Sequence, residues 1–124
     1  NKNSKYFKKK VKILNLNETE NFYKKVPIKM IKISDYIDVN RISTIDILKI
    51  DTEGYELKVL EGLSPNQKII RFIYFEHHYD DMILMKYTFK DINNILLKYG
   101  FKEVYKSKMF FRKSFEYIYK NTYC

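Results

Sequence analysis

Apolar residues recur along the chain at two spacings, which predict strands in some segments and helices in others. Alternating or nearly continuous apolar runs predict strands, whereas apolar residues three and four positions apart predict helices. The predicted strands are Val26–Ile33, Ile45–Ile50, Ile69–Glu76, Phe101–Tyr105, Met109–Phe111 and Phe115–Tyr119. The predicted helices are Asp35–Val39, Tyr55–Glu61 and Phe89–Tyr99. Because strands and helices alternate, we expect an α/β fold with mostly parallel strands, in which the last two strands form an antiparallel edge.

Residues with strong capping preferences set the predicted bounds of the helices. Ser34 and Thr88 are expected N-caps, and Asp91 stands three residues after Thr88, as in a capping box. Gly62 and Gly100 follow the last apolar positions of two helices, where glycine commonly ends a helix. These signals make the helix that follows Thr88 the best-defined one in the sequence.

The run Ile45–Ile50 is almost entirely apolar and rich in β-branched residues. Such a run is typical of a strand that is buried on both faces of a parallel sheet. It contains Lys49, whose amine we expect to reach solvent or a carboxylate along the sheet surface. The run Val26–Ile33 is expected at a sheet edge, because Pro27 cannot donate a hydrogen bond to a neighbouring strand.

Positive charge is concentrated near the N-terminus. The chain has 124 residues and a net charge of +9; residues 1–32 hold ten lysines and two glutamates, a net of +8. We interpret residues 1–25 as a basic arm or the remnant of an upstream segment, with a short strand-like piece at Val11–Leu16, and residues 26–124 as the domain. A basic arm can bind nucleic acid or an anionic membrane surface.

Composition weakens the case for nucleic-acid recognition. There are 21 lysines but only 3 arginines, and arginine is the preferred reader of phosphates and guanine. Abundant Lys, Ile, Asn and Tyr without Ala or Trp is what an A+T-rich coding sequence produces throughout a protein. Cys124 is the single cysteine, which excludes an intrachain disulfide. No apolar run approaches the roughly 20 residues of a membrane span, so we expect a cytoplasmic protein.

Carboxylates gather at the ends of two predicted strands, where open α/β sheets bind their ligands. Asp51, Glu53 and Glu56 follow the first buried strand, and Glu76 closes the next one, beside Asp51 if the two strands are neighbours. Glu53 and Glu56 also suit the first turn of a helix for purely electrostatic reasons. His77 and His78 are adjacent and point to opposite sides of an extended chain, so we predict no metal site.

The segment around these acids resembles the signature of the FkbM-type methyltransferase family. The resemblance rests on Ile45–Glu56, which is similar to "DLLKIDVEGAE", and on Val59–Gly62, which is similar to "VLKGA". Val26–Ile28, Ile33–Ile37, Phe72–His77 and Tyr99–Phe101 are also similar to family segments. The resemblance covers about residues 26–124, and its central motif is far more specific than a lone glycine-rich pattern.

The resemblance implies a Rossmann-like class I fold and methyl transfer from S-adenosylmethionine to a hydroxyl of a small molecule or glycan. It implies that Asp51, Glu53 and Glu76 take part in catalysis, as acceptor-orienting groups or as the base, and that Glu56 and His77 contact the substrate. The family's cofactor half precedes this signature, so we expect the C-terminal half of the fold, with cofactor-binding residues upstream and self-association or a missing partner half. The alternative is a non-catalytic remnant or a basic module that binds an anionic partner.

Overall fold

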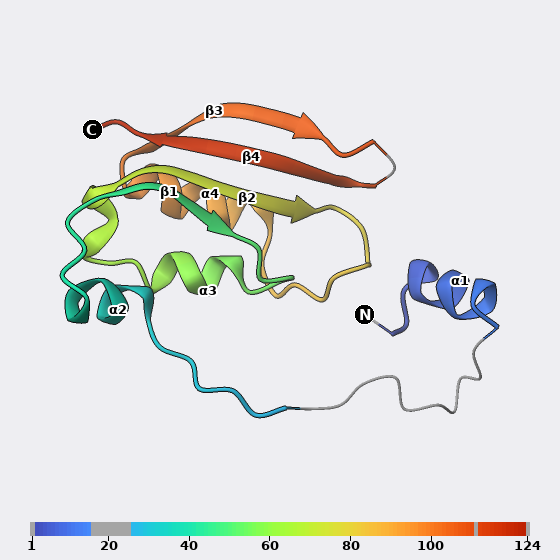
Figure 1. The fold of residues 1–124 in the computed structure, drawn as a ribbon. Helices are drawn as coiled ribbons and strands as arrows, with labels where there is room; N and C mark the ends of the chain where they lie inside the picture. Colours follow the sequence, from blue (N-terminus) through green and yellow to red (C-terminus); the bar gives the residue numbers. More distant parts are fainter. Residues whose placement is uncertain (1, 16–25, 111, 124) are drawn as a thin grey trace.

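The structure, a computed structural model, describes residues 2–15, 26–110 and 112–123. Its helices are α1 (Lys5–Ile13), α2 (Ile33–Val39), α3 (Glu56–Glu61), the 3-10 helix η1 (Asn66–Ile69) and α4 (Phe89–Lys98). Its strands are β1 (Ile45–Ile50), β2 (Ile70–His78), β3 (Phe101–Lys108) and β4 (Ser114–Asn121). Figure 1 shows one sheet with α3 below it and α4 behind the strands. In the described ranges, no helix has the length and apolar character required to cross a bilayer.

The four strands form one mixed sheet in the order β1-β2-β4-β3. β1 pairs with β2 in parallel, and β4 pairs antiparallel with both β2 and β3. The predicted α/β class is therefore confirmed, and the last two strands of the chain, β3 and β4, pair antiparallel at one edge of the sheet, with β4 as the inner strand of the two. The expectation of mostly parallel pairing is wrong, because β1 and β2 are the one parallel pair in the described sheet. The predicted strand Met109–Phe111 is also wrong as far as Phe110, because β3 already ends at Lys108 and the chain then turns.

One face of the sheet is covered by α3 and α4. The core is formed by Ile50, Leu60, Leu63, Ile70, Ile73, Phe75, Ile92, Leu96, Phe101, Tyr117 and Tyr119. Aromatic rings join the layers: the Phe75 and Tyr117 rings stack with centroids 5.4 Å apart, and Phe89 of α4 stacks on Tyr117 at 4.4 Å. Burial of these large side chains supplies most of the hydrophobic stabilisation of the fold.

The opposite face of the sheet, which we call the open face, carries no helix in the described part of the chain. Ile47 of β1 is 64% exposed there, and Phe72 of β2 is only partly buried. The prediction that Ile45–Ile50 is buried on both faces is therefore wrong. The physical reason is that α3 and α4 pack on the same side of the sheet, and that β1 pairs with a single described strand.

The N-terminal predictions are the least successful. Val26–Lys32 has no regular structure, and Ile33, the last residue of the predicted strand, begins α2. The N-cap of α2 is Lys32, so Ser34 lies inside the helix. Alternation creates two faces, but a strand also needs a neighbour, and no described strand pairs with this segment.

The strand-like piece predicted at Val11–Leu16 is wrong for its described residues: Val11–Ile13 are helical and Leu14 and Asn15 form a turn, while Leu16 lies outside the described residues. Val11–Ile13 belong to α1, whose N-cap Ser4 accepts a hydrogen bond from the Phe7 N–H at 3.1 Å. Lys10 and Lys12 occupy the last turn of α1, where positive charge interacts favourably with the helix dipole. The sequence reading overlooked both signals.

Candidate active site

Glu56 organises the loop that connects β1 to α3. Its carboxylate accepts hydrogen bonds from the Thr52 N–H at 3.1 Å, the Thr52 hydroxyl at 3.0 Å and the Gly54 N–H at 3.1 Å, and also from the Tyr87 hydroxyl. The side chain is only 4% exposed. Glu56, which the family resemblance implies as a substrate contact, therefore makes its hydrogen bonds to the protein's own loop.

The ionisation of Glu56 follows from these contacts. Burial raises the pKa of the carboxyl, but the hydrogen bonds from Tyr87, the backbone and Thr52 together outweigh burial, so the pKa is lowered. Burial and the hydrogen bond to Glu56 raise the pKa of the Tyr87 hydroxyl. Glu56 is therefore a buried, charged and fully engaged acceptor that holds the loop in shape.

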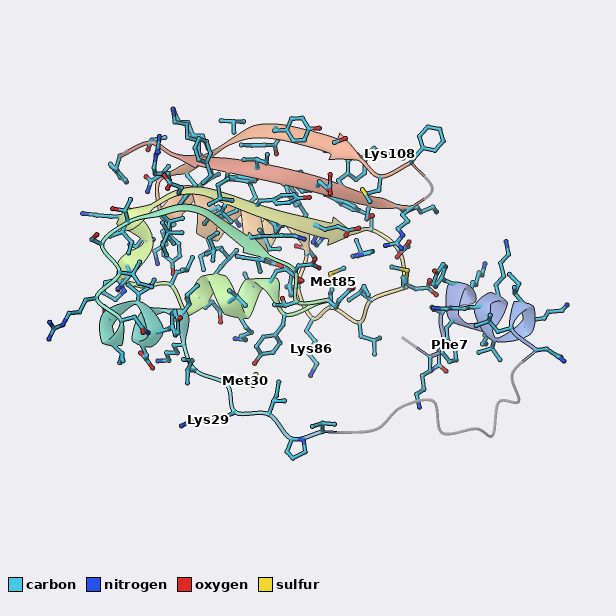
Figure 2. All side chains as sticks on the ribbon, viewed as in Figure 1. Phe7, Lys29, Met30, Met85, Lys86 and Lys108 are labelled. Carbon is cyan, nitrogen blue, oxygen red and sulfur yellow. The ribbon has the colours of Figure 1, made fainter. Side chains whose placement is uncertain are left out.

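The same loop has an unusual backbone that brings it against a second loop. Glu53 and Gly54 both have positive φ angles, +53° and +106°. A Cβ at Gly54 would stand 2.8 Å from the Leu84 carbonyl oxygen and 2.9 Å from the Ile83 side chain. Figure 2 shows Met85, on the loop that leads into α4, close to the end of β1. Glycine is required at position 54 by both conformation and space.

Asp51 directly follows β1 and Glu76 lies inside β2, so the two acids come from neighbouring strands as predicted. The prediction that Glu76 closes its strand is wrong, because β2 stays paired with β4 as far as His78. Ile50 pairs with Phe75, so the next residues, Asp51 and Glu76, continue the two strands side by side. Lys49 reaches Asp51 with its amine at 3.1 Å from Oδ2, which confirms the expectation that this lysine finds a carboxylate. Both acids belong to the open face, because alternate residues of a strand share a face.

Tyr74 lies among these acids. Its hydroxyl donates to Glu116 Oε1 at 2.5 Å, and the Lys49 amine stands 5.7 Å from its ring centre. The hydrogen bond to Glu116, burial, and the negative charges of Glu116, Glu76 and Asp51 raise the pKa of Tyr74 to about 12. Three carboxylates from three adjacent strands therefore surround one phenol on the open face.

The two histidines point to opposite faces of β2, as predicted. His77 is buried among aromatic side chains, with ring centres 4.8 Å from Tyr79 and 5.7 Å from Phe89. Burial lowers its pKa, the negative charge of Glu56 opposes that shift, and His78 adds to it. Of the residues expected to contact substrate, Glu56 and His77 thus lie on the helix-covered side, away from Asp51 and Glu76.

His78 is the histidine that the structure brings to the acids. Its Nε2 lies 3.5 Å from Glu76 Oε1, and its Nδ1 lies 3.9 Å from Asp80 Oδ1. The family resemblance implies a substrate contact for His77 and names none for His78. The signal that could have found His78 is the period of two along a strand, which puts residues 76 and 78 on one face.

A groove of about 790 Å³ borders the loop between β1 and α3 at Thr52 and Tyr55. Its walls are the segment that enters α2 and one side of α3, and its lining is mostly apolar. The lining residues are Met30, Ile31, Lys32, Ile33, Tyr36, Thr52, Tyr55, Lys58, Val59, Glu61 and Gly62. Neither Asp51 nor Glu76 lines it, so the groove and the open-face acids are separate features.

No group of three or more His, Cys, Asp or Glu side chains in the described ranges could hold a metal ion. A family model described as the methyltransferase FkbM domain matches residues 2–103 of the 124 residues. No curated protein matches the chain, and no solved structure matches it.

Proposed function

Because the chain belongs to the FkbM methyltransferase family, we propose that it takes part in methyl transfer from S-adenosylmethionine to the oxygen of a hydroxyl-bearing small molecule or glycan. The observation that carries this proposal is the pair Asp51 and Glu76, each of which is the next residue after the paired Ile50 and Phe75 of two parallel strands. The carboxyl ends of parallel strands are where α/β enzymes place their ligands. The sheet is then the C-terminal half of a Rossmann-like class I methyltransferase.

The described residues orient the acceptor and take its proton. Lys49 holds one oxygen of Asp51, which leaves the other oxygen to accept a hydrogen bond from the acceptor hydroxyl and to aim it. Glu76 Oε1 lies 3.5 Å from His78 Nε2, and the other oxygen of the Glu76 carboxylate is the base that receives the hydroxyl proton. Glu53 adds negative charge at the exposed tip of the same loop.

The loop between β1 and α3 does not fit the nucleoside part of S-adenosylmethionine. The Thr52 and Gly54 N–H groups, which could have faced a ligand, are turned inward to Glu56. Gly54 itself is packed against the loop at Leu84 and does not border open space. The cofactor, which supplies the methyl group on a positively charged sulfur, is therefore bound mainly by residues outside those described here.

Methyl transfer is tested in the full natural protein that contains this chain. The protein is incubated with S-adenosylmethionine that carries a radiolabelled methyl group and with polar metabolites and glycans extracted from the source cells. The radioactivity transferred into alkali-stable methyl ethers is then counted. We expect Glu76→Gln and Asp51→Asn to lower transfer by about 100-fold or more, the usual contribution of a general base and its partner. Asp46→Asn, at the other end of β1, should retain wild-type transfer. Undiminished transfer in Glu76→Gln would remove this residue from the mechanism.

Cofactor binding is tested separately on the 124-residue chain. We expect negligible heat in a calorimetric titration with S-adenosylmethionine, because the loop N–H groups are already occupied. Micromolar binding by the chain alone would contradict this expectation and would place the cofactor against the described residues.

A further inference from the structure

The helix α1 carries positive charge that no acid in its own segment balances. Residues 2–15 hold six lysines and no aspartate or glutamate. Lysine is frequent throughout the protein, but residues 33–124 hold 14 lysines and arginines against 13 aspartates and glutamates, so acids balance it there. The unbalanced charge is therefore a local property of the segment that contains α1, and composition alone does not explain it.

The lysines of α1 have no acidic partner within the described part of the chain. Their side chains are exposed, and no carboxylate of the described ranges forms an ion pair with them: Lys5, Lys8, Lys9, Lys10 and Lys12. Four of them are three or four positions apart and share one side of the helix: Lys5, Lys8, Lys9 and Lys12. Figure 1 shows α1 set apart from the sheet and from α3 and α4, and the exposure of these lysines leaves this side open to an external partner.

Exposed apolar side chains lie beside the lysines. Tyr6 is 50% exposed and Ile13 is 70% exposed, and a separation of seven positions places them on the same side of the helix. Lys9 and Lys10 flank this pair, because about 3.6 residues per turn put one of them on either side of it. Val11, by contrast, is buried, so the exposed side differs from the side that the protein covers. One exposed side of α1 thus combines apolar and positive side chains.

We propose that α1 is a docking site for an anionic phospholipid surface, which it contacts with Tyr6 and Ile13 at the acyl boundary and with its lysines at the lipid phosphates. A basic amphipathic helix lies in the plane of such an interface, where apolar burial and charge attraction act together. Lysine suits this position, because its long apolar stem lets the amine reach the headgroups. Nucleic acid would match the charge alone and leave the apolar pair in water, and α1 has no arginine, the preferred reader of phosphate and guanine.

The test is co-sedimentation of the 124-residue chain with lipid vesicles at physiological ionic strength. One preparation is pure phosphatidylcholine, and the other is an equal mixture of phosphatidylcholine and phosphatidylglycerol, which is anionic. The first variant replaces the shared lysine side of α1: Lys5→Gln, Lys8→Gln, Lys9→Gln and Lys12→Gln together. The matched control removes the same charge from exposed lysines elsewhere: Lys86→Gln, Lys90→Gln, Lys102→Gln and Lys120→Gln together.

We expect the chain to bind the anionic vesicles and not the neutral ones. Replacement of the α1 lysines should weaken binding by at least about 100-fold, because each lysine at an anionic surface strengthens binding by about fivefold. The control replacement should weaken it by under about threefold, because charges beyond the Debye length are largely screened. Ile13→Asn should weaken it by about fivefold, since it removes an apolar side chain from the interface.

Tryptophan fluorescence tests whether the apolar side of α1 enters the interface. The chain contains no tryptophan, so Tyr6→Trp introduces a single fluorophore there. Tyr105→Trp is the matched control, because Tyr105 is also 50% exposed and lies on β3. We expect anionic vesicles to shift the Tyr6→Trp emission to shorter wavelength and to leave the Tyr105→Trp emission unchanged.

Equal binding to neutral vesicles, equal losses in the two lysine variants, no binding to either vesicle, or an unshifted Tyr6→Trp emission on bound vesicles would overturn the proposal. Binding of duplex DNA or RNA without binding of vesicles would also overturn it and assign the helix to nucleic acid. Thermal unfolding shows whether each variant folds; if the α1 lysine variant does not, Ile13→Asn takes its place. No readout requires methyl transfer, so the inference stands or falls independently of the proposed function.

Discussion

The two faces of the sheet are built from alternate residues of the same strands and yet have opposite properties. On the helix-covered face, the Tyr119 hydroxyl donates to Asn93 at 2.7 Å and the Tyr79 and Tyr117 hydroxyls pair at 2.7 Å. On the open face, Glu76 Oε1, His78 Nδ1 and Ser114 Oγ make no hydrogen bond to any described residue, although His78 lies within 4 Å of Glu76 and Asp80. The exception on the covered side is His77, whose Nδ1 is also unpaired within the described residues.

The difference separates residues that hold the fold from residues that are available for binding. A polar group with its hydrogen bonds made by the protein itself, such as Glu56, has little left to offer a ligand. A buried group without partners has a favourable interaction still to gain. By this criterion we predict a role in binding and catalysis for Glu76 and His78, whereas Glu56 holds the loop in shape.

The largest expected effect comes from truncating the two phenylalanines of β2, which lie on opposite faces. Phe75→Ala removes a ring that stacks on Tyr117 in the core and should lower the free energy of unfolding by about 3–5 kcal/mol. Phe72→Ala, on the open face, should cost only about 1 kcal/mol, because its ring is partly solvated already. Urea denaturation measures both. Equal losses would show that the open face is covered in solution.

The next effect concerns two glutamates of α3. Glu56→Gln should destabilise the protein by about 2–3 kcal/mol, because the Thr52 and Gly54 N–H groups and the Tyr87 hydroxyl lose a charged acceptor that is itself buried. Glu61→Gln, which removes an exposed ion pair with Lys58, should cost under about 0.5 kcal/mol. Thermal unfolding of the two variants side by side gives the comparison. A small effect of Glu56→Gln would contradict its structural role.

A smaller effect is the pH dependence of stability that His77 causes. Burial holds its pKa below the ordinary value, so the unfolded chain binds a proton more readily than the folded one. Stability is then full above the ordinary histidine pKa of about 6.5 and falls as the pH drops below it. His77→Phe should flatten this fall between pH 7.5 and 5.5 in urea denaturation. An unchanged slope would mean that His77 does not contribute.

The smallest effect on stability is expected at Ile47. This exposed residue lies on β1, whose described pairing is with β2 alone, and such strands invite pairing with another chain. We expect the wild-type chain to self-associate at micromolar concentration, and Ile47→Lys to weaken association while changing the free energy of unfolding by under about 0.5 kcal/mol. Sedimentation velocity of both proteins decides. A monomeric wild type would argue against self-association through this surface.

The elements that could be predicted from sequence are those with local and redundant signals. β1 has the predicted bounds, because a short run rich in β-branched residues favours a strand over a helix. α4 has the predicted start, with Asp91 accepting from the Thr88 N–H at 2.8 Å, and it is followed by Gly100 with a φ of +84°. The strand predicted over 26–33 rested on the alternation of apolar residues alone. It failed because alternation does not show whether another strand is available to pair with the segment.

The sequence predicted which acids lie near each other, but it did not predict which side chains share one face of the sheet. Asp51 and Glu76 are side by side because β1 and β2 are neighbours, a relation that strand order alone suggested. The family resemblance points to His77, whereas the period of two along a strand places His78 on the same face as Glu76 and His77 on the opposite face. The inward role of Glu56 could not be foreseen, because its partner Tyr87 is 31 residues away.

The contact between the Gly54 loop and the loop before α4 has a consequence for recombination between relatives. Residues 51–56 and 83–87 are joined by the close approach of Gly54 to Leu84 and by the hydrogen bond from Tyr87 to Glu56. The two loops must therefore come from the same parent protein for these contacts to form, even though a strand and two helical segments separate them in the chain. A chimaera with a crossover between these segments combines loops of different origin, whereas a crossover before β1 or within α4 keeps the pair intact.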